Sequence, residues 1–331
     1  MAQRKLNKQQ KTRIRAQQDR TLNNISQSGT DSSINDQQLQ GTVIQHHGKQ
    51  AIVENGSGDL ITCKIRQNLG SMVCGDRVIY QISAEDQQGV ILAIEERDSV
   101  LMRPDFRRNP KAFAANINQI IIVAAPEPEL SEHLLDRYLV VLESLGLTGV
   151  IVINKSDLLS EAALMMIQEQ LQTYKNLGYP IVYTSVKTAL GLEGLKGILK
   201  DKSSILVGQS GVGKSSLINQ LIPDLDLRTS ELSQANHGKH TTSSSTLYHL
   251  PFGGDILDSP GVRDFSVWHI SEQHIASGFI EFKPYLGQCR FHNCKHTNEP
   301  DCAIKQAVEK GEISERRLKS YQAMLVEIAQ D

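Results

Sequence analysis

Alternating apolar and polar positions mark the first patterned part of the chain. From residue 41 onward, short runs of aliphatic and β-branched residues are separated by polar turns that contain glycine or aspartate. These runs are TVIQHH, QAIVEN, DLITCKI, DRVIYQI and GVILAIEE. Short strands without an intervening helical pattern are typical of a small all-β barrel of the oligonucleotide-binding (OB) type. We therefore predict an OB-type barrel over residues 41–98.

The pattern then changes to alternating strands and helices, and predicts an α/β domain over residues 99–266. A linker at about 97–117 leads into the apolar strand QIIIVAA and the helix SEHLLDRYLVVLESLG, with Ser131 as N-cap and Gly146 at its end. Further strands alternate with helical segments, namely GVIVIN, PIVYTS, SSILVG and GGDILD. This alternation indicates a mostly parallel sheet with helices on both faces.

The two ends of the chain lack strand patterns. Residues 1–40 are rich in Gln, Asn, Ser and basic side chains, and the first twenty residues hold seven Lys/Arg against one acid, Asp19. Such a segment buries too little apolar surface to offset its ordering entropy, so we expect a basic disordered tail. Residues 267–331 predict a small helical domain that ends in the amphipathic helix EISERRLKSYQAMLVEIAQ.

Composition narrows the class of protein. The chain of 331 residues has a net charge of −2 and 39% hydrophobic residues, which suits a globular protein of several domains. It contains neither an apolar run of membrane-spanning length nor a secretory signal, so we expect a cytoplasmic protein without a membrane partner. Three of its five cysteines crowd with histidines near the C-terminus. That arrangement favours metal binding over disulfides.

Residues 208–215 read GQSGVGKS and match the GxxxxGK[ST] phosphate-binding loop. The motif follows an apolar strand and opens a helical run, which is the context it requires. Backbone N–H groups at such a helix start bind phosphate, Lys214 reaches the β- and γ-phosphates, and Ser215 binds Mg²⁺. Lys214 is thereby also a catalytic candidate. The predicted phosphate-binding residues are Gly208, Gln209, Ser210, Gly211, Val212, Gly213, Lys214, Ser215 and Ser216.

A second motif selects the base. Asn154, Lys155, Ser156 and Asp157 form NKSD at the end of the strand GVIVIN. A carboxylate at Asp157 can accept hydrogen bonds from the N1–H and 2-amino groups of guanine, and adenine leaves it unpaired. TSVK at the end of the next strand adds Ser185 and Lys187 to the predicted guanine loops. NKSD thus argues against the alternative of a metabolic P-loop ATPase or kinase.

Two further segments predict contacts with Mg²⁺ and the γ-phosphate. Asp258 and Gly261 belong to DSPG, which matches DxxG, so Asp258 is expected to bind Mg²⁺ through water and the Gly261 amide to sense the γ-phosphate. The stretch GKHTTSSS, residues 238–245, suits a switch loop whose threonine completes the Mg²⁺ shell. We assign this threonine to Thr242, with Thr241 as the alternative.

The position that holds the water-orienting glutamine in Ras-type GTPases is Val262 here. Another group must orient the attacking water, or turnover stays slow until a partner supplies one. His240 is the nearest candidate within the switch stretch, and His237 is a weaker one. That neither histidine takes part in the chemistry remains an open alternative.

The cysteine and histidine cluster predicts a structural zinc site. Cys289, Cys294, His296 and Cys302 form a Cys₃His set with the spacing C-x₄-C-x-H-x₅-C, and His292 is left as a spare candidate. Four protein ligands leave no position for a reactive water, so the site is expected to be structural. The remaining cysteines, Cys63 and Cys74, fall in or beside barrel strands and are expected to be packing residues.

The order of the motifs points to a family. NKSD, TSVK, GQSGVGKS, GKHTT and DSPG stand in this order, whereas ordinary GTPases begin with the phosphate loop and end with the guanine loops. This rotated order is that of circularly permuted GTPases. With a barrel before it and a Cys₃His element after it, the chain closely resembles the bacterial RsgA (YjeQ) family of small-subunit-dependent GTPases. The resemblance runs from about residue 40 to the C-terminal helix and includes RPDFRRNPKAFAANINQIIIV and LDSPGVRDF.

This resemblance implies a late-stage maturation factor of the 30S ribosomal subunit that binds GTP and GDP, is stimulated by the subunit, and contacts 16S rRNA with its barrel and zinc element. It also implies a role in turnover for the switch histidine, which matches His240, and suits a monomer. The barrel departs from single-strand binders, because residues 41–96 hold four Lys/Arg against seven Asp/Glu, and Tyr80 is the only aromatic residue there. Contact with folded RNA therefore fits better than base stacking.

Two hypotheses about the activity remain to be separated. In one the chain is an assembly GTPase; in the other it is a zinc-stabilised RNA-binding module whose nucleotide site has negligible turnover. DSPG is followed directly by the C-terminal domain, which also leads to the hypothesis that γ-phosphate loss is transmitted to the zinc element through residues 265–275.

Overall fold

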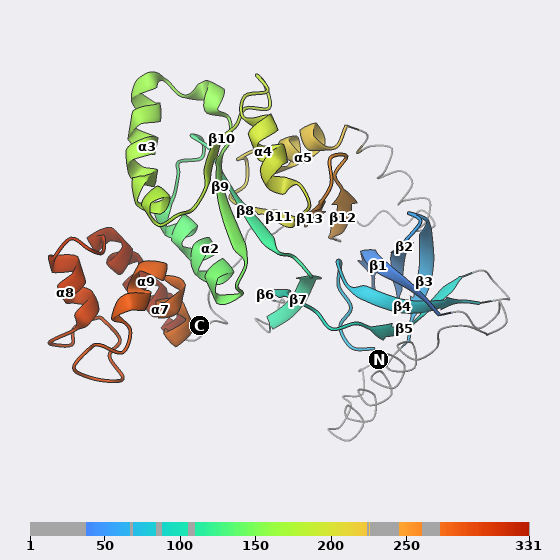
Figure 1. The fold of residues 1–331 in the computed structure, drawn as a ribbon, viewed down its shortest axis with the longest axis horizontal. Helices are drawn as coiled ribbons and strands as arrows, with labels where there is room; N and C mark the ends of the chain where they lie inside the picture. Colours follow the sequence, from blue (N-terminus) through green and yellow to red (C-terminus); the bar gives the residue numbers. More distant parts are fainter. Residues whose placement is uncertain are drawn as a thin grey trace.

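The computed structural model describes residues 38–66, 69–83, 88–104, 110–223, 225, 245–259 and 272–330. Within them it has the predicted architecture: an all-β barrel, a mostly parallel α/β domain and a helical C-terminal region with a Cys₃His cluster. Figure 1 shows the barrel and the C-terminal region at opposite ends of the molecule, with the α/β sheet between them. The first 37 residues of the predicted tail lie outside the described residues.

The barrel consists of five strands in the order β1-β2-β3-β5-β4, and pairing of β1 with β4 closes it. Antiparallel pairing is broken only between β3 and β5, which run parallel. Alternate side chains such as Val43, Val53 and Ile91 fill the interior with no exposed surface. The strands are β1 (Gln38–His47), β2 (Gln50–Asn55), β3 (Leu60–Ile65), β4 (Arg77–Ile82) and β5 (Gly89–Ile94).

Two details of the sequence prediction are wrong at the borders of the barrel. Residues 38–40 belong to β1 and not to the tail, because they pair with β4 from Gln38↔Gln81 to Gln40↔Ile79. The predicted linker at 97–117 contains a hairpin of β6 (Val100–Pro104) and β7 (Pro110–Ala115). Burial of apolar side chains at Leu101 and Ala114 stabilises this hairpin, and polar or basic neighbours hid the strand pattern in the sequence.

The α/β domain is built on a sheet with the order β10-β9-β8-β11-β13-β12, in which all neighbouring strands are parallel except the antiparallel pair β13 and β12. All six residues of β8 are buried, as expected for a strand covered on both faces. In Figure 1, α2 and α3 lie to one side of this sheet and α4 and α5 to the other. The strands are β8 (Gln119–Ala124), β9 (Thr148–Ile153), β10 (Ile181–Tyr183), β11 (Ser203–Val207), β12 (Thr246–His249) and β13 (Asp255–Asp258).

The helices of this domain begin and end close to the predicted signals. Ser131 caps α2 by accepting a hydrogen bond from the Leu134 amide, and Gly146 has a φ of 66° just past the helix end. The helices are α2 (Glu132–Ser144), α3 (Glu161–Asn176), α4 (Leu192–Leu199) and α5 (Lys214–Leu221), with a 3₁₀ turn η2 at Ser156–Leu158. Strand β12 has no counterpart in the sequence prediction.

β12 joins the barrel to the α/β sheet. Its inner edge pairs with β13, and its outer edge pairs with β1 at Gln45↔Thr246, so one continuous sheet runs through both domains. The barrel and the α/β sheet are therefore joined by the backbone pairing of β12 with β1.

The C-terminal region packs on α2. Its elements are α7 (Glu272–Gly278), η4 (Ile280–Tyr285), α8 (Ala303–Glu309) and α9 (Glu315–Gln330). Phe279, Phe282 and Tyr321 form its aromatic centre, with ring centroids 4.9–5.8 Å apart. In Figure 1 this region lies beside α2, on the side of the sheet away from the barrel.

Candidate nucleotide site and metal cluster

The predicted nucleotide-binding loops converge on one edge of the sheet. NKSD follows β9, TSVK follows β10, the phosphate loop follows β11, and Asp258 ends β13. Because these strands are parallel, their carboxyl ends meet at the same edge, where α/β proteins bind ligands. Motifs separated by more than a hundred residues are thereby neighbours in space.

Three glycines of the phosphate loop have a positive φ, and at two of them a Cβ atom would also collide with another part of the chain. Gly208 has a φ of 142°, and a Cβ there would collide with the carbonyl oxygen of Val123 in β8. Gly213 has a φ of 94° as the N-cap of α5, and a Cβ there would collide with the side-chain amide of Asn154. The loop thus turns tightly between β11 and α5 and presents the start of the helix at the edge of the sheet.

Lys214 folds back over the phosphate loop. Its Nζ donates to the carbonyl oxygens of Gly208 and Gln209, both at 2.7 Å. Ser215 and Ser216 follow it on exposed positions of the first turn of α5. An ammonium group held over the loop in this way can transfer its hydrogen bonds to phosphate oxygens.

Asn154 connects the guanine loops to the phosphate loop. Its side-chain Nδ2 donates to the Val212 carbonyl at 2.9 Å, and its Oδ1 accepts from the Thr184 hydroxyl at 3.1 Å. Asn154 is only 2% exposed and Thr184 is fully buried. The Asn154 amide therefore sets the spacing between the three loops, and does not itself lie open to a base.

Asp157 is the exposed carboxylate of this group. Ser185, itself fully buried, donates its hydroxyl to Asp157 Oδ1 at 2.6 Å and accepts from the Thr188 amide. This bond fixes the carboxylate and leaves its second oxygen for a ligand. Lys155 lies beside it with a φ of 57°, and its Nζ donates to the carbonyl oxygen of Glu127 at 3.2 Å.

Asp258 lies on the phosphate side of the site. Burial raises the pKa of its carboxyl group, and the positive charge of Lys214 opposes this shift. In the sheet Asp258 is opposite Thr246 of β12, and the next residue, Ser259, accepts a hydrogen bond from the Ser245 hydroxyl at 2.8 Å. A half-buried carboxylate close to the phosphate-loop lysine is suited to hold a Mg²⁺–water complex.

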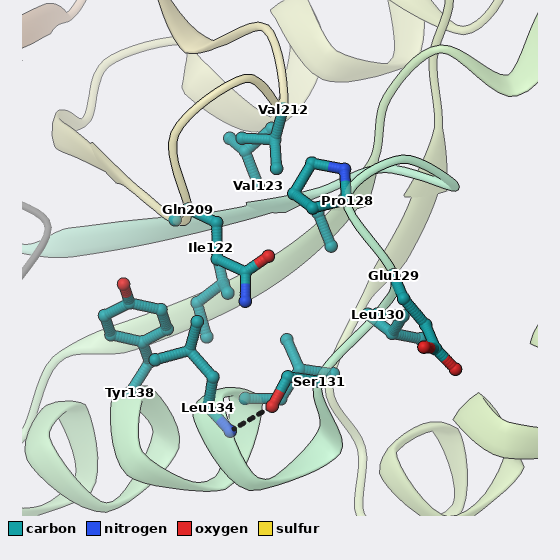
Figure 2. Close-up of a pocket in the computed structure, with 13 residues that line it drawn as sticks. Ile122, Val123, Pro128, Glu129, Leu130, Ser131, Leu134, Tyr138, Gln209 and Val212 are labelled. Atoms are coloured by element: carbon teal, nitrogen blue, oxygen red, sulfur yellow. Dashed lines mark hydrogen bonds between the residues drawn. The ribbon is translucent and has the colours of Figure 1, made fainter.

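A small cavity separates the phosphate loop from the start of α2. Figure 2 shows the Gln209 side chain pointing into it, with Pro128 on one side and Ser131 and Leu134 below. Its volume of about 20 Å³ is close to that of a single water molecule. It is too small for a nucleotide, so it is a packing feature under the phosphate loop.

The Cys₃His cluster has the dimensions of a tetrahedral metal site. The ligand atoms of Cys289, Cys294, His296 and Cys302 all lie within 4.8 Å of one another. Cys289 Sγ is 3.8 Å from Cys302 Sγ, and His296 Nδ1 is 3.5 and 3.4 Å from these sulfurs. A tetrahedron with Zn–S bonds of about 2.3 Å has S–S edges of roughly 3.8 Å. The donor set therefore fits one four-coordinate metal ion.

Burial has opposite effects on the two kinds of ligand. It lowers the pKa of His296, which favours the neutral imidazole that binds metal, and it raises the pKa of the Cys294 and Cys302 thiols, which disfavours the thiolate form. Gln322 of α9 donates to the His296 carbonyl at 3.1 Å, and Tyr321 donates to the Lys295 carbonyl. These two hydrogen bonds from α9 therefore fix the loop that carries the metal ligands. Cys63 and Cys74, by contrast, are buried among apolar residues as predicted.

Several predicted residues fall outside the described residues. They are His237, His240, Thr241, Thr242 and Gly261, and their roles remain predictions. Lys187 is exposed beside the guanine loops. The sequence prediction missed Thr184 as a second anchor of Asn154, although it stands in the quoted motif TSVK. It also missed the residues that dock β12 on the barrel, because only pairing across domains reveals them.

The fold and these loops define a P-loop GTPase whose guanine loops precede its phosphate loop, which is a circularly permuted GTPase. The RsgA GTPase family model matches residues 94–268. A small ribosomal subunit biogenesis GTPase RsgA of Hahella chejuensis is 45% identical, over 97% of this chain and 95% of its own length. The protein of the same name from Proteus mirabilis is 42% identical, over 100% of this chain and 97% of its own.

Two solved structures have a similar fold. YjeQ from Thermotoga maritima superposes with a TM-score of 0.74 at 37% identity, over 89% of this chain and 100% of its own. YloQ, described as a circularly permuted GTPase, gives a TM-score of 0.70 at 30% identity, over 91% of this chain and 98% of its own. The chain belongs to the RsgA GTPase family and is a GTP-hydrolysing enzyme. No helix among its described residues is long and apolar enough to cross a membrane.

Proposed function

We propose that this GTPase acts in the cytoplasm as a late-stage maturation factor of the 30S ribosomal subunit. Its relatives are named small ribosomal subunit biogenesis GTPases, and two of them match nearly its whole length. The observation that carries the proposal is the junction of the guanine and phosphate loops through Asn154, which makes one continuous site for a guanine nucleotide. We expect a monomer that contacts 16S rRNA and binds no membrane.

GTP contacts both the guanine loops and the phosphate loop. Asp157, oriented by Ser185, reads the Watson–Crick edge of guanine, and the aliphatic part of Lys155 covers one face of the base. The amides of residues 208–216 and the ammonium of Lys214 bind the phosphates. Ser156 supports this arrangement because its hydroxyl donates to the Thr184 carbonyl at 2.9 Å. Lys187 completes the guanine loops, and Gly261 senses the γ-phosphate.

Mg²⁺ accompanies the nucleotide. Ser215 and Thr242 supply hydroxyl ligands, and Asp258 binds the ion through water. Lys214 stabilises the charge that develops on the γ-phosphate, and His240 orients the attacking water, with His237 as the alternative. When bound, Mg²⁺ would neutralise phosphate charge, and the residues named above would hold it and position the reacting groups.

The Cys₃His cluster holds one structural Zn²⁺. Support comes from its near-tetrahedral spacing and from the neutral form of His296. Removal of the ion with a chelator should loosen the loop at 289–302, and GTP affinity should stay unchanged because the cluster lies far from the nucleotide loops. Zinc content per chain and GTP affinity before and after chelation provide the two readouts.

Turnover with and without purified 30S subunits tests the main proposal. GTP hydrolysis should rise strongly when 30S subunits are added, and ATP should be neither bound tightly nor hydrolysed. Equal GTP turnover in both conditions would contradict the proposed function and favour an RNA-binding module with a regulatory nucleotide site. Tight ATP binding would contradict the assignment of NKSD.

Asp157→Asn tests the reading of the base. Loss of the carboxylate should lower GTP affinity by about a hundredfold or more, because two buried donors of guanine lose their acceptor. Xanthosine triphosphate should gain affinity, since its ring can pair with the new amide. Glu193→Gln on α4, which carries only the surface pair with Lys196, is the matched control. Unchanged GTP affinity in Asp157→Asn would contradict the role of Asp157.

A further inference from the structure

Strand β12 lies between the nucleotide site and the barrel. On its inner edge, Thr246 is opposite Asp258, the residue assigned to Mg²⁺. On its outer edge, the same Thr246 is opposite Gln45 of the barrel strand β1. The Gln45 side chain donates its Nε2–H to the Thr246 hydroxyl at 2.7 Å. Gln45, Thr246 and Asp258 thus stand in register across three strands.

The other end of β12 is attached to the barrel through an ionic bridge. The ring of His249 contacts Asp255 of β13 through Nδ1 at 2.5 Å and Glu54 of β2 through Nε2. Glu54 and Asp255 bind opposite ring nitrogens, so the imidazole stands between the two domains as a cationic link. We call these three residues the Glu54–His249–Asp255 bridge. Figure 1 shows β12 beside β1 and β2, at the side of the sheet facing the barrel.

These contacts lie outside the predicted nucleotide-binding motifs. Neither Gln45 nor His249 belongs to a nucleotide-binding motif, and both lie where β12 meets the barrel. In the chain β12 starts immediately after the hydroxyl-rich stretch 238–245 and is followed by the strand that ends at Asp258. Any displacement of Asp258 between nucleotide states is therefore imposed on β12 and, through its two attachments, on the barrel.

We propose that Gln45 and His249 are positioning residues that couple the occupancy of the γ-phosphate site to the orientation of the barrel. The coupling to the nucleotide rests on the proposed function through the assignment of Asp258 to the phosphate side of the site, and the coupling to the small subunit rests also on the proposed partner. Coupling between two sites is reciprocal, so engagement of the barrel by the small subunit must also act on Asp258. The barrel is then both the reporter of the nucleotide state and the route by which the subunit stimulates hydrolysis.

The first test needs no ribosome. Hydrogen–deuterium exchange of the full chain is measured with GDP and with a non-hydrolysable GTP analogue. In the wild type, amides of β1 and β2 should exchange at different rates in the two states. In His249→Ala and in Gln45→Ala this difference should shrink by about fivefold or more, the usual size of an allosteric coupling. Identical exchange of β1 and β2 in both nucleotide states of the wild type would overturn the inference.

The second test uses purified 30S subunits. His249→Ala should lower the stimulated kcat and leave the KM for GTP within about twofold, because the residue touches no nucleotide. Glu54→Gln, which alters the bridge from the barrel side, should have the same effect. The double variant should be no worse than either single variant. A stimulated kcat equal to that of the wild type in both single variants would overturn the inference.

Lys283→Ala is the matched control for both tests. Lys283 forms an exposed ion pair with Glu143 at 3.1 Å, which joins the C-terminal region to α2 and lies on the opposite side of the domain. It should keep the exchange difference and the stimulated kcat. Absent stimulation of the wild type by 30S subunits would contradict the proposed function and leave the exchange test of the coupling valid.

Discussion

The two attachments of the GTPase domain are built from different chemistry. The C-terminal region is attached to α2 through Arg317, a guanidinium with no exposed surface between the buried carboxylate of Asp136 and Glu281. The barrel is attached to β12 through one residue pair, through the apolar side chains Ile44 and Ile52, which are buried in the same core cluster as Leu247, and through the Glu54–His249–Asp255 bridge, whose imidazole is 49% exposed. The ion pairs of the first junction are sealed from water, whereas the ionic bridge of the second is half open to it.

Because its ion pairs are buried, we expect the junction between α2 and the C-terminal region to be rigid. Burial by itself lowers the pKa of Arg317, but hydrogen bonds with Glu281 and the charge of Asp136 outweigh this and raise it. The guanidinium also lies 4.3 Å from the ring centroid of Phe279. Separation of the two surfaces would break the Arg317–Asp136 pair and expose the apolar side chains buried between α7 and α2 to water, which is unfavourable. We infer that α2 and the C-terminal region move as one body.

The open junction has a different consequence. Water can replace the partners of a half-exposed imidazole at little cost, so the ionic part of this junction opposes a change in the orientation of the barrel only weakly. The adjustable junction is also the one next to Asp258, whereas the fixed junction lies on α2. We therefore expect the nucleotide state to change the orientation of the barrel more than that of the zinc-bearing region. The hypothesis of transmission through residues 265–275 remains a prediction, because 260–271 lie outside the described residues.

The largest expected effect is at the sealed junction. Arg317→Ala should destabilise the docked C-terminal region by about 3–5 kcal/mol, because it leaves Glu281 without its guanidinium partner and Asp136 with Arg316 as its remaining counter-ion. Urea unfolding followed by Tyr fluorescence and by zinc release measures this. Arg290→Ala, which removes an exposed pair with Asp301, should change the same transition by about 0.5 kcal/mol or less. A similar small effect in both variants would contradict the distinction between the two junctions.

An effect of intermediate size is expected at the junction between β12 and the barrel, where the contribution of the His249 bridge to stability should depend on pH. Hydrogen bonds with Asp255 and Glu54 raise the pKa of His249 from 6.5 to about 10. Because the folded pKa is the higher one, the stabilisation is complete below pH 6.5 and is lost as pH rises towards 10. The difference in melting temperature between the wild type and His249→Gln should therefore be largest near pH 6.5 and vanish near pH 10. A difference that grows with pH would contradict the bridge.

The smallest effect is expected at the rim of the sealed junction. Lys283→Ala removes a pair in which the lysine side chain is 51% exposed, so its loss should cost about 0.2–1 kcal/mol. Added salt should reduce that difference further, because it screens exposed charges. Unfolding in low and high salt measures it. An effect as large as that of Arg317→Ala would show that the rim, and not the buried guanidinium, holds the two parts together.

Local signals explain why much of the molecule was predictable. Some signals depend only on a few neighbouring residues and can therefore be recognised in the sequence. Examples are the capping serine of α2, the glycines of the phosphate loop and the five alternating runs of the barrel. The Cys₃His spacing also stayed within a short stretch. Prediction failed at the hairpin of β6 and β7 and at β12, whose short strands are stabilised by partners distant in the chain.

The amino-acid sequence by itself determined the class of this protein. Motif residues such as Asp157 and Lys214 carry chemistry that few other side chains supply, and their order along the chain identified the permuted GTPase. Tertiary structure alone decided how the site is connected to the rest of the molecule. Gln45 and His249 are unremarkable in sequence, and they acquire a role only because β12 pairs with strands from two domains. Such pairing depends on contacts over about two hundred residues, which no local pattern encodes.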